Sequence, residues 1–231
     1  ETYRISFKFN GKTYYGFKGD TLSSALLANN VHLVGRSFKY HRPRGIMTAG
    51  SEEPNAIVQL HNNLPRTEPN VRATEVEIYE GLEASSQNCW PSVNFDIGGI
   101  NNILSPLLPA GFYYKTFMWP AKLWKTYEYF IRKSAGLGVS ATERDPDLYD
   151  HNYYHCDVLI IGSGPAGLTA ASIAIKSGKK VLLVDEKADH GGSLVGSDSD
   201  LTKINEETPK DWINKTFSNL SKNNNIKILN R

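Results

Sequence analysis

The sequence predicts an α+β domain followed by an α/β domain with a parallel sheet. The N-terminal segment alternates between apolar and polar residues on both sides of Asn10-Gly11, and residues 156–187 read as strand, glycine-rich turn, helix and strand. Alternation around Asn-Gly is a strong signal of a β-hairpin, whereas strand–helix–strand units build parallel sheets. The expected parts are a domain over 1–84, an ordered connector over 85–154 and a second domain over 155–231.

The first domain opens with the elements of a β-grasp fold. After the hairpin, Asp20 or Thr21 can cap a helix whose apolar residues lie near helical spacing over 22–28. A loop and further strands with period-two alternation follow. Hairpin, helix, loop and strand in this order predict a β-grasp domain. The expected strands are 3–9, 13–17, 55–61 and 74–81.

The connector is rich in aromatic residues. Residues 85–135 abound in Trp, Tyr, Phe, Pro and Gly, which is not the composition of a flexible linker. We expect an ordered segment with a helix that ends near Gly136. Its stretch 112–120, FYYKTFMWP, either lines a contact with a cofactor or subunit, since aromatics concentrate at interfaces, or fills the seam between the two domains.

The second domain begins with a turn of the kind that binds dinucleotides. Gly162, Gly164 and Gly167 form GxGxxG between the apolar strand 156–161 and a helix. The first glycine permits the tight turn, the second lets the backbone approach a pyrophosphate, and the third lets helix and strand pack closely. The helix N-terminus attracts the phosphates. An acid belongs about 20 residues later, and Asp185 ends the next strand. These features predict an incomplete Rossmann-like domain.

Asp185 favours NAD or FAD over NADP, because a carboxylate accepts hydrogen bonds from a ribose diol and repels a 2′-phosphate. The motif does not separate NAD from FAD, and Lys187 slightly weakens the case against NADP. The loop 190–193 either approaches the nucleotide closely or is a plain turn. A helix over 209–220 and a strand over 226–229 follow. Because such domains normally continue through further strands, we expect the N-terminal part of a longer protein.

Composition and charge argue against several classes of function. The net charge of +2 gives no basic field of the kind that favours nucleic acid or a membrane surface. No apolar run approaches the roughly 18 residues of a membrane span. The two cysteines, Cys89 and Cys156, are too few for a disulfide framework or a multi-cysteine metal site and favour a reducing, cytoplasmic setting. We predict no metal, no nucleic acid and no membrane partner.

The β-grasp domain would suit a plant-type [2Fe–2S] ferredoxin, yet its loop lacks the ligands. Such a cluster needs C-x4-C-x2-C and one more distant cysteine. The corresponding loop, residues 35–60, contains no cysteine, and the ligand positions fall on Thr48, Glu53 and Ala56. We therefore expect a ferredoxin-like fold that has lost its cluster. His41 in this loop is a candidate base to which the sequence assigns no acid.

Several stretches taken together resemble one family. RSFKYHRPRGI, EPNAIVQL, SSQNCWPSVNFD, LPAGFYYKTFMWP, DPDLYD and CDVLIIGSGPAGLTAA occur in this order. They resemble the N-terminal part of the alpha subunit of heterotetrameric sarcosine oxidase over nearly the whole chain. Related amine and amino-acid dehydrogenases share HRPRG but usually continue into cluster cysteines, so the missing cysteines favour the sarcosine oxidase branch.

The resemblance implies an activity for a whole complex and a narrower role for this chain. The family oxidises sarcosine with O2 and water to glycine, hydrogen peroxide and either formaldehyde or methylene-tetrahydrofolate. The resemblance implies that the alpha subunit binds NAD and that the beta subunit holds FAD and the sarcosine site. It also implies FMN at the alpha–beta interface and a folate-binding domain at the C-terminal end of the alpha subunit. Gamma and delta subunits complete the complex. No catalytic residue is expected in this chain.

The resemblance also assigns a nucleotide site. The matching residues are Gly162, Gly164, Ala166 and Gly167 at the pyrophosphate, Asp185 and Glu186 at the adenosine ribose, and Lys187 and Ser193 nearby. Two other hypotheses remain open. One is an alpha-like subunit of a different amine or opine dehydrogenase, and the other is a non-catalytic scaffold module that binds NAD.

Overall fold

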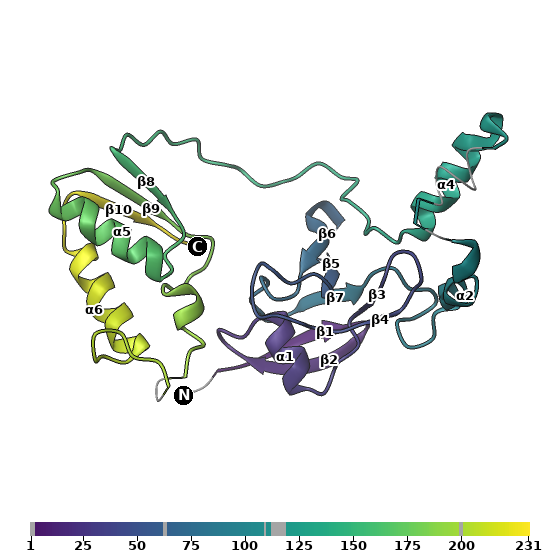
Figure 1. Cartoon of the computed structure of the whole chain (residues 1–231), viewed down its shortest axis with the longest axis horizontal. Helices are drawn as coiled ribbons and strands as arrows, with labels where there is room; N and C mark the ends of the chain where they lie inside the picture. The colour runs from purple at the N-terminus through teal and green to yellow at the C-terminus, as the bar shows by residue number, and fades with distance from the viewer. Residues whose placement is uncertain (1–2, 62–63, 109, 112–118, 199–200) are drawn as a thin grey trace. The chain divides into compact units, whose positions relative to one another are not determined.

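The chain folds into two compact units, Glu1–Leu148 and Tyr149–Arg231, drawn from purple to teal and from green to yellow in Figure 1. Each unit has its own hydrophobic core. The predicted connector 85–154 falls mostly within the first unit, and its treatment as a separate part remains a prediction. The computed structural model describes residues 3–61, 64–108, 110–111, 119–198 and 201–231.

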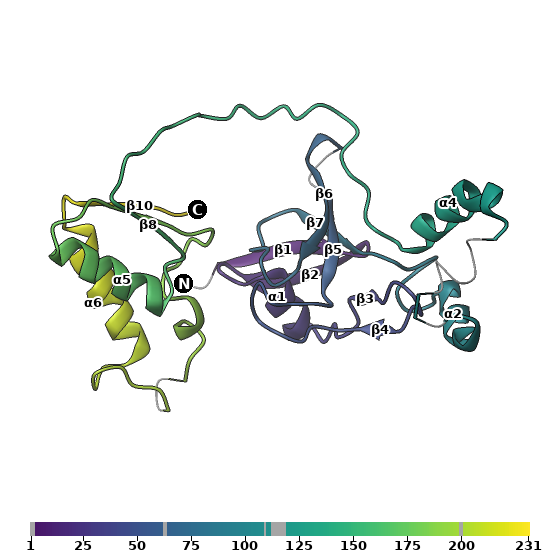
Figure 2. The same ribbon diagram turned by 45° about the horizontal axis from the view of Figure 1, so that its top comes forward.

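The first unit is built on a five-stranded sheet, whose strands are labelled in Figures 1 and 2. β1 pairs in parallel with β7, and the other neighbours are antiparallel. The hairpin turns at Asn10-Gly11, whose φ values of 51° and 76° suit the two left-handed positions of a type I′ turn. This arrangement confirms the predicted β-grasp fold. The strands are β1 (Arg4–Phe9), β2 (Lys12–Phe17), β5 (Ile57–His61), β6 (Thr67–Arg72) and β7 (Leu82–Ser86), in the order β2-β1-β7-β5-β6.

Helix α1 (Leu22–Ala28) contributes to the core of this unit. Thr21 caps it, because its side chain accepts a hydrogen bond from the N–H of Ser24 at 3.2 Å. Leu22 and Leu26 are fully buried. The sheet and adjoining loops supply the other core residues, among them Ile5, Phe7, Phe9, Val34, Val58, Leu60, Leu82 and Ala84.

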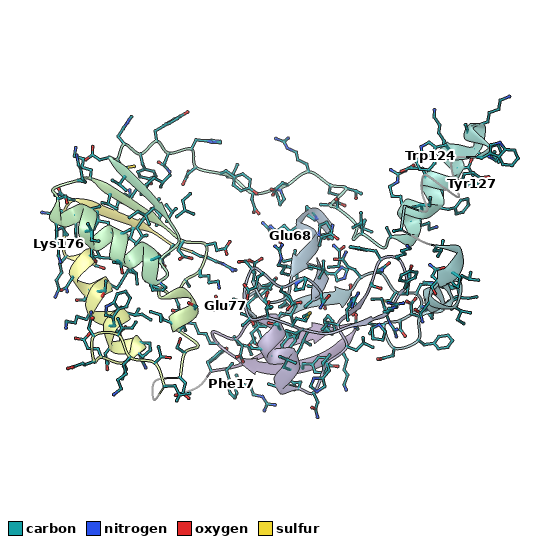
Figure 3. All side chains as sticks on the ribbon, viewed as in Figure 1. Phe17, Glu68, Glu77, Trp124, Tyr127 and Lys176 are labelled. Carbon is teal, nitrogen blue, oxygen red and sulfur yellow. The ribbon has the colours of Figure 1, made fainter. Side chains whose placement is uncertain are left out.

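The strand predicted over 74–81 is wrong. The segment forms only an isolated bridge between Thr21 and Glu77. Figure 3 labels Glu77. Val76 and Ile78 are buried, so the alternation in the sequence is real. It arises because alternate side chains of an irregular segment reach the core, without a partner strand on either side. The sheet strands instead flank this segment as β6 and β7.

The remainder of the first unit consists of short elements. The helix predicted to end near Gly136 is α4 (Trp124–Ser134), which carries Trp124 and Tyr127 (Figure 3). Residues 112–118 lie outside the described part of the chain, so both interpretations of FYYKTFMWP stay open. The other elements are β3 (Gly35–Arg36) paired with β4 (Pro43–Arg44), and the helical turns η1 (Leu64–Arg66), η2 (Ile97–Gly99), α2 (Ile100–Ile103), η3 (Ser105–Leu107) and η4 (Ala121–Leu123).

The second unit is a three-stranded parallel sheet in the order β10-β9-β8. Both long helices cover one face of it (Figures 1 and 2), with a core that includes Leu168, Leu183 and Leu220. This is the first half of a Rossmann-like domain, as predicted, including the third strand. In the described residues, no helix is long and apolar enough to cross a bilayer. The elements are β8 (Val158–Ile161), α5 (Pro165–Lys176), β9 (Val181–Val184), η5 (Gly192–Leu194), α6 (Pro209–Ser221) and β10 (Ile226–Leu229).

Candidate nucleotide-binding site

The glycine turn joins β8 to α5 at the carboxyl edge of the sheet. Gly162 has a φ of +94°, which favours glycine, and its N–H donates to the carbonyl of Val184 at 2.7 Å. Gly164 is the N-cap of α5, and Pro165 occupies the first helical position, where its missing N–H is not needed. The turn therefore begins the helix directly at the strand end.

Gly167 brings α5 close to the turn. A Cβ atom at this position would lie 1.9 Å from the carbonyl oxygen of Gly162 and 3.4 Å from Cγ2 of Ile160. No side chain fits there without moving the backbone, so the third glycine of the motif has the packing role that the sequence predicts. Because α5 begins at Pro165, the N–H groups of Ala166 and Gly167 have no partner within the helix.

Asp185, the residue after β9, is tied to the glycine turn by Ser163. The backbone N–H and the hydroxyl of Ser163 both donate to Oδ2 of Asp185, at 2.5 and 2.6 Å. The other oxygen, Oδ1, accepts from the N–H of Lys187 at 2.9 Å. Ser163 is fully buried. The carboxylate is thus held in one orientation by three donors.

These contacts keep Asp185 ionised. Partial burial acts to raise the pKa of its carboxyl group, but the hydrogen bonds from Ser163 and Lys187 and the nearby His190 lower it. The net pKa lies below the ordinary value. A charged acceptor is what a ribose diol requires, and the charge opposes a 2′-phosphate.

His190 approaches the same turn from the loop after β9. Its Nδ1 atom lies 2.9 Å from the hydroxyl oxygen of Ser163, and its ring stacks on Phe217 of α6 at a centroid distance of 4.0 Å. Because Ser163 gives its single proton to Asp185, the contact requires Nδ1 of His190 to be the donor. Asp185, Ser163 and His190 therefore form a chain of hydrogen bonds, with serine in the middle.

The loop 190–193 packs on the glycine turn, and its close approach to a nucleotide stays a prediction. The N–H of Gly191 donates to the carbonyl of Ser163 at 2.9 Å. A Cβ atom on Gly192, whose φ is +54°, would lie 3.0 Å from Cα of Gly164. Two glycines here allow one backbone to approach another closely.

The structure thus gathers only part of the predicted set. Gly162, Gly164, Gly167 and Asp185 meet at one edge of the sheet. The backbone N–H of Lys187 reaches Asp185, but the side chains of the remaining predicted residues are exposed: Ala166, Glu186, Lys187 and Ser193. Sequence reasoning missed Ser163 and His190. Ser163 could have been suspected, since a hydroxyl between the two glycines stands beside the strand end that carries the acid.

A second buried polar pair lies in the first unit. Nδ1 of His41 is 2.6 Å from Oδ2 of Asp96, and the two side chains are 9% and 1% exposed. Oδ1 of Asp96 accepts from the N–H groups of Trp90 at 3.0 Å and Gly98 at 3.1 Å. The sequence assigned no acid to His41, and the structure supplies one. The pair ties η2 to the β3–β4 hairpin, and we interpret it as structural.

The fold and the turn together define a protein with a ferredoxin-like domain followed by the beginning of a nucleotide-binding oxidoreductase domain. Residues 2–89 match a family model described as a 2Fe-2S iron-sulfur cluster binding domain. Residues 157–226 match a model described as FAD dependent oxidoreductase. The solved structure of L-proline dehydrogenase from P. horikoshii aligns with a TM-score of 0.53 and 17% identity, over 99% of this chain and 33% of that chain. This last likeness concerns the fold alone.

The chain is homologous to sarcosine oxidase alpha subunits and corresponds to their N-terminal part. It is 55% identical to the subunit from Rhizobium meliloti over 98% of this chain and 23% of that protein. It is 34% identical to the subunit from Corynebacterium sp. strain P-1, over 92% of this chain and 17% of that protein. The chain thus spans less than a quarter of the length of these curated relatives.

The residues of the ferredoxin-like domain do not fit the cluster that the first family description implies. A plant-type cluster needs four thiolates, and the chain has two cysteines, Cys89 and Cys156, the second of which belongs to the other unit. Among the described residues, no group of three or more His, Cys, Asp or Glu side chains could hold a metal ion. The loop 35–60 has no thiol to offer.

Proposed function

We propose that this chain binds the ADP half of NAD at the glycine turn, as part of the alpha subunit of a sarcosine oxidase-type complex. The observation that carries the proposal is the ionised Asp185, fixed at the end of β9 by two hydrogen bonds from Ser163. A carboxylate at this point of a Rossmann-like half is the group that binds an adenosine ribose.

Counting lone pairs indicates which oxygen meets the ribose. A carboxylate has about four acceptor sites. Oδ2 of Asp185 already accepts two protons from Ser163, whereas Oδ1 accepts one, from Lys187. Oδ1 therefore retains an acceptor site for one ribose hydroxyl. The N–H groups of Ala166 and Gly167 at the start of α5 are the donors for the pyrophosphate.

The reaction belongs to the assembly as a whole. We propose that it oxidises sarcosine with O2 and water to glycine, hydrogen peroxide and formaldehyde or methylene-tetrahydrofolate. FAD would be held by the beta subunit and FMN at the alpha–beta interface, with gamma and delta subunits completing the complex. The homology to sarcosine oxidase alpha subunits supports this. This chain contributes nucleotide binding and no catalytic residue. Both cysteines are free, in keeping with the cytoplasmic location we propose.

FAD is the second candidate ligand, because residues 157–226 match a family described as FAD dependent. FAD and NAD share the ADP half, so the turn and Asp185 would serve either. The remaining hypotheses, an alpha-like subunit of another amine or opine dehydrogenase and a non-catalytic NAD scaffold, differ in the activity of the complex. Turnover of the purified assembly with a panel of amines separates these two from the sarcosine oxidase proposal.

A substitution at the acid tests the ribose role. In the full-length protein stripped of nucleotide, we expect NAD to bind at least about tenfold more tightly than NADP, because Asp185 repels the 2′-phosphate. Asp185→Ser should narrow this ratio, and the exposed Asp189 provides the control Asp189→Ser. Equal preference for NAD and NADP in both variants and in the unmodified protein would contradict the proposal.

A further inference from the structure

A glutamate side chain is buried inside the loop that corresponds to the cluster loop of a ferredoxin. Glu53 lies between β4 and β5 and is 1% exposed. Burying a carboxylate is costly unless donors replace the water it loses. The structure must therefore supply those donors from the loop itself.

Four backbone N–H groups surround this carboxylate. Oε2 of Glu53 accepts from Met47 at 2.8 Å and from Thr48 at 2.7 Å. Oε1 accepts from Asn55 at 2.8 Å and from Ala56 at 3.1 Å. The hydroxyl of Thr48 is a fifth donor, 3.3 Å from Oε2. Since a carboxylate has about four acceptor sites, these donors occupy them all. No lone pair remains for a metal ion.

The three positions that the ligand spacing assigns to cysteines converge on this carboxylate. Thr48 and Ala56 stand at the first and third positions, and both donate their N–H groups to Glu53, which stands at the second. In an iron–sulfur protein, cysteine sulfurs accept hydrogen bonds from the surrounding structure. Here a carboxylate accepts them, so the loop keeps its donors satisfied without a thiol.

The loop is also held from outside by the last residue of β6 and by the segment that follows it. Arg72 donates from Nε to the carbonyl of Glu53 at 3.2 Å. The hydroxyl of Thr74 donates to the carbonyl of Gly50 at 2.7 Å. Glu53 is therefore held through its backbone as well as its side chain, and its carboxylate cannot leave the loop interior without breaking these contacts.

The electrostatics agree with an ionised group. Burial acts to raise the pKa of Glu53, but the N–H groups of Thr48, Asn55, Met47 and Ala56 outweigh it and hold the pKa below the ordinary value. A carboxyl group with a depressed pKa stabilises the fold above its unfolded-state pKa, about 4.3. That stabilisation disappears as the pH falls through the folded-state pKa.

We propose that the Glu53 carboxylate takes the place of a [2Fe–2S] cluster, acting as an internal anion around which the ferredoxin-like domain folds without metal. The domain is then a structural part of the protein, and electrons in the assembled protein do not pass through it. This inference concerns the first unit and does not rest on the proposed binding of NAD.

The first test compares Glu53→Gln with Glu52→Gln in the full-length protein. Glu52 is exposed and adjacent, so it controls for the loss of one charge. In Glu53→Gln, the NH2 group of the amide faces backbone N–H groups, and it cannot accept hydrogen bonds from them. At pH 7 we expect the unfolding midpoint of the first domain to fall by about 5 °C or more in Glu53→Gln, and by about 1 °C or less in Glu52→Gln. The gap should shrink as the pH falls below about 4.3.

Failure of Glu53→Gln to fold, with Glu52→Gln folded, supports the internal anion. Equal midpoints for the two variants, with the same dependence on pH, would overturn it.

The second test uses the unmodified protein. The protein would be incubated anaerobically with ferrous iron and sulfide, and iron and labile sulfide per chain would then be assayed. We expect the iron content and the labile sulfide content to be no higher than in a control protein that binds no iron–sulfur cluster. A stoichiometric cluster with iron–sulfur absorption would overturn the proposal, whatever the stability of the variants.

Discussion

Ser163 and Asp185, 22 residues apart in the chain, are joined by two hydrogen bonds that reach one carboxylate oxygen. The first residue lies inside the glycine turn and the second directly follows β9. The contact fixes the acid before any nucleotide arrives, because the Ser163 backbone is itself held by β8 and α5. The proposed binding of a nucleotide would then cost less conformational entropy than it would with a free carboxylate.

Removing the hydroxyl of Ser163 should weaken nucleotide binding without unfolding the domain. Ser163→Ala retains the backbone N–H but deletes the hydrogen bond to Oδ2 of Asp185, and a bond to a charged group contributes about 1.5–3 kcal/mol. We expect roughly tenfold weaker binding of NAD, measured by calorimetry on stripped protein. Ser177→Ala, which removes an exposed hydroxyl from the end of α5, is the control. Unchanged affinity in Ser163→Ala would show that the orienting contact has no role.

Gly167→Ala should destabilise the second unit. The new methyl group would lie 1.9 Å from the carbonyl of Gly162, so helix and strand must separate. We expect a loss of about 3 kcal/mol in the free energy of unfolding, measured by denaturant titration of this unit. Gly196→Ala is the control, since a Cβ atom there meets nothing within 4 Å. Similar stabilities for the two variants would mean that the close packing is not needed.

Acid should remove the contribution of Asp185 to stability. Its folded-state pKa is depressed by donors from Ser163 and Lys187, so its contribution is present above the unfolded-state value of about 3.9. It is lost as the pH falls through the folded-state pKa. The difference in stability between the unmodified protein and Asp185→Asn should therefore be constant from pH 7 to about 5 and shrink below about 4. A stability difference that grows as the pH falls would contradict this prediction, because it would mean that the folded-state pKa of Asp185 is raised.

The buried pair in the first unit should also matter for stability. Asp96→Ala leaves His41 and the N–H groups of Trp90 and Gly98 without their acceptor, and breaking a buried pair costs roughly 3 kcal/mol or more. Chemical unfolding of the first domain measures the loss. Glu68→Ala, on the exposed edge of β6 (Figure 3), should change stability by less than about 0.5 kcal/mol. Retained stability in Asp96→Ala would remove the structural role assigned to the pair.

Local patterns were sufficient to predict most of the fold. Asn10-Gly11, the glycine motif and the apolar strands of the second unit are signals within a few residues of the elements they specify. The prediction of a strand over 74–81 was wrong because alternate side chains can be buried without a partner strand. Only the tertiary arrangement, in which this segment makes no strand pairing beyond an isolated bridge to Thr21, distinguishes the two cases.

The site was predicted less completely for the same reason. The glycines and Asp185 could be predicted from their spacing, because Rossmann-like units share the same spacing between the glycine turn and the acid. The contacts of Ser163 with His190 and of His41 with Asp96 join residues 27 and 55 positions apart, and no local pattern connects them. Glu53 was located by counting ligand positions, but its burial within four N–H groups requires the folded loop.

The identity of the bound nucleotide tests the proposed function most directly. The subunit that carries this sequence would be purified in its natural assembly, separated from its partners and denatured, and each released nucleotide identified by absorbance and mass. We predict one NAD per chain, with flavin recovered from the partner subunits or their interface. Release of FAD from this subunit, with no NAD, would contradict the proposal and make Asp185 a ligand of a flavin ribose.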